Sequence, residues 1–341
     1  MLRPGLHWLR MPLPFALDHI NLWLLEDEVD GIGGWTAIDC GIADEPTRHA
    51  WESLFDGTFG GRPLLRAIAT HFHPDHLGLA DWLLRGGDRE RWSATLWMTA
   101  AEYMIGRFLS GTGGEAQRPD HGLHRSFYRS HGVEAQEAAQ RAQSRGESRY
   151  AQMVPAVPPS YMRIVEGDPI RIGVDAEAAR LFRVITGFGH APEHACLMCD
   201  EERILVSGDM VLPGISTNVS VYEVEPEGDP LSRYLDSIDR LARLPADTLV
   251  LPSHGLPFFG LHARIRQLHA HHRERLDATL QACGTPRSAH EVLPVLFRRS
   301  LDQHQIGFAF GETLAHLHHL WHRGLLRRER GADGVYRFGR V

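Results

Sequence analysis

The chain of 341 residues is 43% hydrophobic and 23% charged, which is typical of a globular protein with a substantial core and excludes large-scale disorder. All 36 residues counted as Lys or Arg are arginine, which excludes a Schiff-base lysine and a phosphate-loop lysine. The net charge of −7 combines −13 over residues 1–261 with +6 over residues 262–341. We therefore expect a larger domain at 1–260 and a distinct domain at 261–341.

Residues 1–14 contain no apolar core of signal-peptide length, and no stretch approaches a membrane span. We therefore expect a cytoplasmic protein with no membrane partner. The four cysteines are too few and too scattered for a disulfide framework. Cys196 and Cys199 lie in one apolar strand, where their spacing places them on opposite faces, so we expect buried free thiols.

The first predicted elements are two paired strands, at residues 18–25 and 35–41. The glycines between them supply the positive φ angles that a hairpin turn requires. Asp39 ends the second strand beside Gly41. A carboxylate in this place can orient a metal-ligating histidine by accepting its second N–H, and a plain turn aspartate is the alternative interpretation.

The densest cluster of potential metal ligands follows the next apolar strand and reads His71-x-His73-x-Asp75-His76. In an extended segment His71 and His73 point the same way and can share one ion. Pro74 then bends the chain, so that Asp75 and His76 can reach a second position. Asp75 is also a candidate N-cap for the helix that follows. The structural alternative is a helix cap with surface histidines.

Helices are expected at residues 45–54 and 80–84, and a strand at 91–98. From about residue 100 to residue 165 the sequence becomes rich in Ala, Gln and Arg, has helical bias and carries several aromatic residues. We interpret this part, 100–165, as a helical insertion. It can serve as a lid over the metal cluster or as the interface of a homodimer, and both interpretations stay open.

Three more candidate ligands each stand where an apolar strand ends, namely His190, Asp209 and His254. Loops at strand ends carry chemistry on a rigid scaffold, and two glycines allow the chain to turn tightly before His190. Ala195 to Val206 is expected to form a hairpin. We expect His194 to hydrogen-bond within its loop without binding a metal.

The last 80 residues predict helices at 262–280, 289–298 and 311–323, followed by a hairpin at 325–338. This order resembles a winged-helix module. The third helix offers no Arg, Asn or Gln along its leading turns to read bases, so we expect a packing or dimerisation role and no nucleic-acid partner. The first helix carries three histidines that we expect on a solvated face: His269, His271 and His272.

Four motifs in order resemble the metallo-β-lactamase-fold hydrolases: His71-x-His73-x-Asp75-His76, Gly189-His190, Gly208-Asp209 and Ser253-His254-Gly255. The resemblance covers about residues 15–260 and implies an α/β fold, the αββα sandwich, with a site at the seam. It also implies that one metal binds His71, His73 and His190, that the other binds Asp75, His76 and His254, and that Asp209 bridges them. The full His and Asp set is similar to the glyoxalase II, ribonuclease Z and lactonase branch.

We therefore expect two divalent metal ions. Zinc is the first choice for such nitrogen-rich ligation, with Mn and Fe as alternatives. Water that bridges two metal ions loses a proton near neutral pH, so we expect a hydrolase that uses a metal-bridging hydroxide oriented by Asp75 and Asp209.

The acidic larger domain disfavours nucleic acid, and the aromatic insertion suits an acyl group, so we expect a small ester or thioester substrate. A lactone or a β-lactam is the alternative substrate class. Two alternatives belong to other classes. A nuclease would grip its substrate with the basic module at 261–341, and a DNA-binding regulator would keep only a vestigial metal site.

Overall fold

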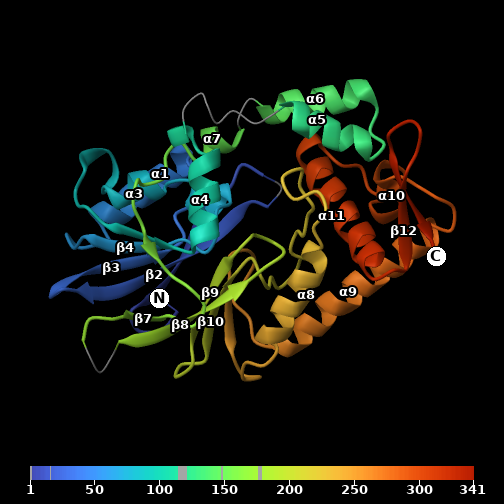
Figure 1. The fold of residues 1–341 in the computed structure, drawn as a ribbon. Coiled ribbons are helices and arrows are strands. Elements are labelled where there is room, and N and C mark those ends of the chain that lie inside the picture. Colours follow the sequence, from blue (N-terminus) through green and yellow to red (C-terminus); the bar gives the residue numbers. More distant parts are fainter. Residues whose placement is uncertain (1, 16, 114–120, 147–148, 176–178) are drawn as a thin grey trace.

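The computed structural model describes residues 2–15, 17–113, 121–146, 149–175 and 179–341. Two β-sheets lie face to face, with helices on their outer surfaces (Figure 1). The first sheet has the order β1-β2-β3-β4-β5-β6. Its strands are Leu6–Pro12, His19–Val29, Ile32–Ile38, Leu64–Ile68, Thr95–Met98 and Met162–Arg163. The second has the order β11-β10-β9-β8-β7, with strands Leu249–Pro252, Ile204–Gly208, His194–Cys199, Arg180–Gly187 and Pro169–Ile172.

Side-chain alternation along the strands explains the layers. Trp23 and Leu25 of β2 point into the core between the sheets, while Leu22 and Leu24 point to the outer helices. In β9, Cys199 lies in the core between the sheets and Cys196 in the outer core of the second sheet. The αββα sandwich is thus confirmed, and so are the buried free thiols on opposite strand faces.

The hairpin β2–β3 is longer than expected, because β2 continues to Val29. Asp30 and Gly31 form its turn with φ angles of 52° and 77°, the conformation that a tight two-residue hairpin requires. The outer surface of this sheet is covered by α1 (Glu45–Asp56), and the short helices α2 (Pro74–Leu77) and α3 (Ala80–Leu84) follow β4.

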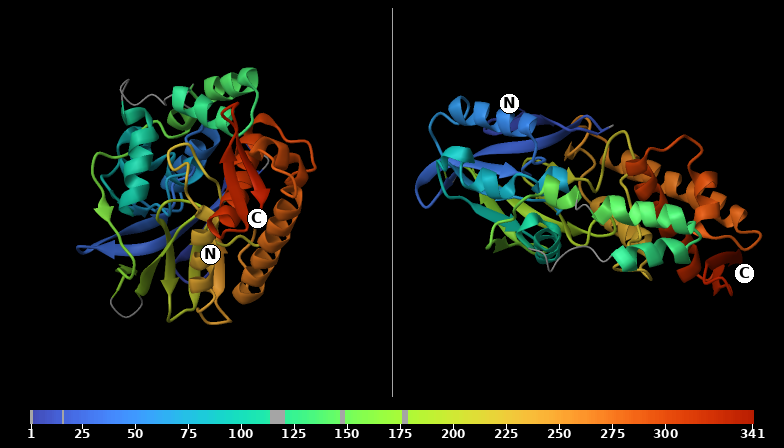
Figure 2. Two further views of the ribbon diagram at one scale, coloured as in Figure 1. Left: turned by 45° about the vertical axis from the view of Figure 1, so that its right-hand side comes forward. Right: turned by 90° about the horizontal axis from the view of Figure 1, so that it is seen from above.

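The described residues of the insertion include the α-helices α4 (Ala100–Leu109), α5 (His121–Ser130), α6 (Ala135–Gly146) and α7 (Arg149–Met153). Helices α5 and α6 pack against the C-terminal part of the same chain (Figures 1 and 2). Phe127 and Tyr128 of α5 share a core with Phe310. The insertion therefore connects the first sheet with the C-terminal helices.

The C-terminal part follows α8 (Pro230–Leu241) and β11. It consists of α9 (Leu261–Ala282), α10 (Ala289–Leu296), α11 (Gln303–His322) and the hairpin β12 (Leu326–Arg330) and β13 (Tyr336–Arg340). Its apolar side chains form one continuous core with α8 and the outer face of the second sheet. In the part of the chain that the structure describes, we find no helix with the length and apolar character to cross a membrane.

The predicted solvated histidine face on α9 is wrong in part. His272 is buried, and its Nδ1 lies 3.3 Å from Nε2 of His316 on α11. His269 is partly exposed and lies 2.7 Å from Asp239 of α8. The two helices pack against each other through histidines, whose neutral imidazoles are tolerated in a core when a ring N–H finds a partner.

Candidate metal centre

The seven predicted ligands come together at one edge of the sandwich, where β4, β8, β10 and β11 end. They form two adjacent groups, and within each group the potential ligand atoms all lie within 4.8 Å of one another. The first group consists of His71, His73, His190 and Asp209, and the second of Asp75, His76 and His254.

The backbone of the first motif differs from the predicted one. Strand β4 ends at Ile68, so His71 and His73 lie in the loop after it and not on the strand. Pro74 begins α2, a position that suits its fixed φ and missing N–H. Asp75 lies inside the first turn of α2, and His73 occupies the N-cap position without a side-chain cap bond. The N-cap role expected of Asp75 is therefore wrong.

The potential ligand atoms of the first group lie about as close together as, or slightly closer than, the ligands of one small cation. Nε2 of His71 lies 2.9 Å from Nδ1 of His73 and 3.2 Å from Nε2 of His190. Oδ2 of Asp209 lies 3.5 Å from Nε2 of His190. Ligands at zinc bond lengths in a tetrahedral site are about 3.3–3.6 Å apart.

The second group is similarly spaced. Oδ2 of Asp75 lies 3.7 Å from Nε2 of His76 and 3.4 Å from Nε2 of His254. The other oxygen of Asp209, Oδ1, lies 3.6 Å from each of these two imidazole nitrogens. Asp209 therefore presents one carboxylate oxygen to each group.

Backbone carbonyls fix the tautomers of two of these histidines. Nδ1–H of His190 donates to the carbonyl of Asn218 at 2.8 Å, and Nδ1–H of His254 donates to the carbonyl of His19 at 2.9 Å. Because a carbonyl can only accept, each ring in its neutral form keeps a lone pair on Nε2, and both Nε2 atoms face the centre of the cluster. This is the arrangement in which histidine binds a metal.

Asp39 lies directly behind His76, with Oδ2 2.8 Å from Nδ1 of that ring. It also accepts from the N–H of Thr70 at 2.7 Å and from its hydroxyl at 3.0 Å. Its own φ is +66°, a conformation that aspartate tolerates better than most residues. These contacts orient His76 with Nε2 toward the second group, as the sequence led us to expect of a carboxylate here.

The pKa shifts of the clustered side chains have opposite directions and reflect their close packing. Burial, followed by the neighbouring imidazoles, lowers the pKa of His71 well below its ordinary value, and burial and His190 lower the pKa of His73 to about 3. Burial alone would raise the pKa of Asp209, but His254 and His76 outweigh it and hold that pKa well below its usual range. Burial alone would lower the pKa of His76, but Asp39 and Asp75 outweigh it and hold that pKa well above its ordinary value. Neutral imidazoles and ionised carboxylates are the metal-binding forms, so His76 must release a proton to bind a metal.

Two buried atoms of the cluster have no hydrogen-bond partner among the described residues, Nε2 of His76 and Oδ1 of Asp209. An unpaired buried polar atom is costly, and both atoms face the second group. One divalent cation in the second group would satisfy both atoms, so the donor set of that group fits a metal ion.

His194 does not behave as expected. It begins β9, and its Nε2 accepts from the N–H of Asp209 at 3.2 Å, while its Nδ1 lies 3.7 Å from Sγ of Cys196. Its bonds thus reach outside its own loop, and it supports the backbone of Asp209 from behind. It is not a member of either ligand group.

The sequence did not single out Glu102 and Tyr150, both from the insertion. Glu102 is buried, and its two oxygens accept from the N–H of Phe72 at 3.0 Å and from the N–H of Glu193 at 2.6 Å. The hydroxyl of Tyr150 donates to the carbonyl of Phe72 at 2.5 Å. The peptide between His71 and His73 is therefore held on both sides.

Burial raises the pKa of Glu102 to about 7, against the lowering effect of the two N–H donors. The sequence Thr99-x-x-Glu102 matches a capping box, which would have placed this carboxylate on its own helix end. Thr99 makes no side-chain cap bond, however, and its hydroxyl donates to the carbonyl of Glu193 at 2.6 Å. The capping-box pattern is visible in the sequence, but the N–H groups that Glu102 accepts from, those of Phe72 and Glu193, lie far from it along the chain.

Comparisons with known proteins agree with this geometry. A family model described as "Metallo-beta-lactamase superfamily" matches residues 17–254, and one described as "Metallo-beta-lactamase-like, C-terminal domain" matches residues 276–341. A solved beta-lactamase domain protein from Burkholderia ambifaria is 48% identical, with a TM-score of 0.87 over 100% of this chain and 94% of that one. A metallo-beta-lactamase family protein from Thermus thermophilus is 29% identical, with a TM-score of 0.78 over the whole of both chains.

Among curated relatives, a probable metallo-hydrolase from Bacillus subtilis is 29% identical over 153 residues, which are 43% of this chain and 47% of that protein. The chain thus spans about half the length of this relative.

Proposed function

The chain belongs to the metallo-beta-lactamase superfamily, and from this premise we propose that it is a hydrolase that binds two divalent metal ions in its two ligand groups. The observation that carries the proposal is the position of Asp209. One of its oxygens faces His190 and the other faces His76 and His254, as a carboxylate shared by two cations requires.

The residues of the chain have separate tasks in this proposal. The imidazoles supply neutral nitrogen ligands whose tautomers are set from outside the cluster. Asp75 and Asp209 balance the cationic charge and orient the attacking water by accepting its hydrogen bonds. When bound, the ions activate that water near neutral pH and polarise the substrate oxygen. Zinc suits this donor set best, with Mn and Fe as alternatives.

We propose a small ester or thioester as the substrate. Residues 1–261 carry a net charge of −13, which repels long polyanions. The exposed side chains of Met104 and Phe108 lie on α4, the helix whose Glu102 holds the ligand loop, and they offer apolar surface to an acyl group. A lactone or a β-lactam is the next substrate class.

The nucleic-acid alternatives are less well supported. Every residue from 309 to 320 of α11 is buried, so this helix cannot enter a DNA groove as a recognition helix. Two arginines of the C-terminal part also form ion pairs with carboxylates of the same chain. Arg328 pairs with Glu227 at 2.8 Å and Arg337 with Asp333 at 2.7 Å. We therefore propose a packing role for the C-terminal part.

A substrate panel tests the proposed function. The full chain is stripped of metal, reloaded separately with Zn²⁺, Mn²⁺ and Fe²⁺, and assayed on thioesters, esters, lactones, a β-lactam, RNA and a phosphodiester. We expect metal-dependent turnover with the highest kcat/KM on an ester or thioester. Turnover of RNA or the phosphodiester alone would favour the nuclease, and no turnover with any metal would contradict the proposed activity.

A further inference from the structure

The loop of residues 210–228 follows β10, precedes α8 and contacts α11. Within it, the hydroxyl of Thr217 donates to the backbone carbonyl of Asp209 at 2.5 Å. The next residue, Asn218, provides the carbonyl that accepts from Nδ1–H of His190. Two ligands of the first group, His190 and Asp209, thus depend on the position of two adjacent loop residues.

Helix α11 holds this loop in its middle. The N–H of Val221 donates to the carbonyl of Gly311 at 3.1 Å. A Cβ atom added to Gly311 would lie 2.6 Å from Oγ and 2.7 Å from Cβ of Ser220, which is too close for any side chain. The hydroxyl of Ser220 in turn donates to Oδ1 of Asn218 at 2.8 Å. A chain of contacts therefore links Gly311 to His190 through Ser220 and Asn218.

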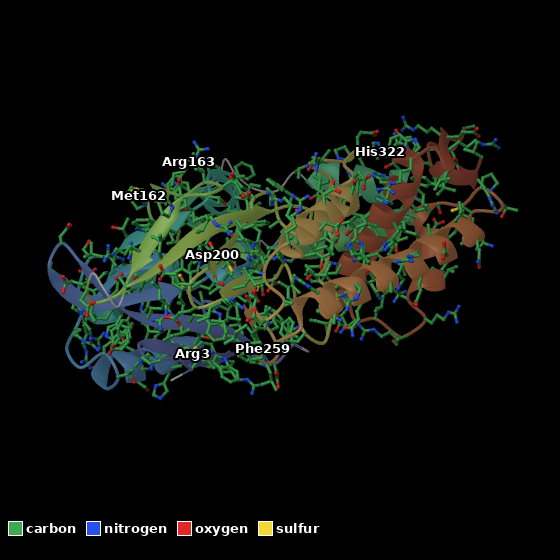
Figure 3. The ribbon with its side chains drawn as sticks, turned by 90° about the horizontal axis from the view of Figure 1, so that it is seen from below. Arg3, Met162, Arg163, Asp200, Phe259 and His322 are labelled. Atoms are coloured by element: carbon green, nitrogen blue, oxygen red, sulfur yellow. The ribbon has the colours of Figure 1, made fainter. Side chains whose placement is uncertain are left out.

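Helix α11 also holds the far end of the loop, through three histidines. Nδ1 of His318 lies 3.0 Å from the carbonyl of Gly228, and Nε2 of His322 lies 2.8 Å from the carbonyl of Glu227. His319 lies 3.2 Å from the carboxylate of Asp229, which caps α8. His322 is seen on the C-terminal part in Figure 3. These contacts account for the unusual run of histidines on α11.

We propose that α11 is a positioning element of the metal centre, and that Gly311 sets the place of His190 through Ser220 and Asn218. The inference rests on the proposed binding of metals by the two groups. It assigns to the C-terminal part a role in the affinity of the first group, beyond packing. The second group shares only Asp209 with this loop, because His254 is oriented by the carbonyl of His19 on the first sheet.

The test is Gly311→Ala, with Gly307→Ala as the matched control. Both glycines lie in α11, where alanine has the higher helix propensity, but Gly307 is exposed with nothing near its added Cβ. Zn²⁺ affinity of the metal-stripped full chain is measured for each site by competition with a chelator. We expect Gly311→Ala to weaken one of the two sites by about tenfold or more, the usual effect of disturbing a residue behind a ligand. Gly307→Ala should leave both sites as in the wild type.

A double-mutant cycle shows whether the effect passes through Ser220. Ser220→Gly removes both atoms that the new Cβ would meet, so Gly311→Ala should weaken zinc much less in that background. If Gly311→Ala does not fold, Ser220→Ala, which adds no clash but breaks the bond to Asn218, should still weaken one site. Wild-type affinity in either variant would overturn the inference. A wild-type chain that binds no zinc would instead overturn the proposed function.

Discussion

Asp209→Ala is expected to abolish hydrolysis while leaving the chain folded. The substitution removes the carboxylate that faces both groups and leaves the ring nitrogens of His190, His76 and His254 without their shared anion. Losing one shared ligand should cost about 4 kcal/mol or more of transition-state stabilisation, which is about a thousandfold in kcat/KM. The measurement is kcat/KM on the best substrate of the panel, together with zinc content and circular dichroism.

The matched control is Asp200→Ala. Asp200 lies at the turn between β9 and β10, where it pairs with Arg183 on the surface (Figure 3). Because exposed ion pairs contribute little, this variant should keep both its zinc and its activity. Full activity of Asp209→Ala would show that the two groups do not share this carboxylate.

Glu102→Ala is expected to lower both stability and zinc affinity. It removes the buried carboxylate that accepts from the N–H groups of Phe72 and Glu193, which should reduce the free energy of unfolding by about 1–3 kcal/mol. The loops that carry His71, His73 and His190 also lose the carboxylate that ties them together. We therefore expect zinc to bind about 10–100-fold more weakly, as measured by chelator competition.

Met104→Ala is the matched control on the same helix, because Met104 is 60% exposed and its truncation leaves no buried polar group. It should change the free energy of unfolding, measured in urea, by less than about 0.5 kcal/mol. If Glu102→Ala unfolded with wild-type stability and bound zinc normally, Glu102 would have no part in holding the ligand loops.

The positions of the candidate ligands could be predicted because the sequence pattern that marks each of them is local. His190, Asp209 and His254 each follow an apolar strand, and strands of one sandwich end at a common edge. The hairpin of β9 and β10 and the alternation of Cys196 and Cys199 follow from the period of two in a strand.

The remaining features could not be predicted, because they depend on partners far apart in the sequence. Glu102 looks like a helix cap until the loop of Glu193 is brought beside it. The histidines of α9 were expected on a solvated face, and the burial of histidines on α11 was not foreseen. In the fold, however, the Nδ1–H of each buried ring, His316 and His318, donates to a backbone carbonyl. The family resemblance implied the candidate ligand set. The contacts of the loop at 210–228 with α11 and with His190 join residues that are far apart in the sequence, so only the structure shows them.

The central claim, that two cations share Asp209, is tested most directly by crystallising the zinc-loaded chain and recording anomalous diffraction at the zinc edge, alongside zinc content per chain. We predict two ions, one among His71, His73 and His190 and the other among Asp75, His76 and His254, with an oxygen of Asp209 on each. A zinc-saturated crystal with no ion between these residues, or with Asp209 turned away from both positions, would contradict the account.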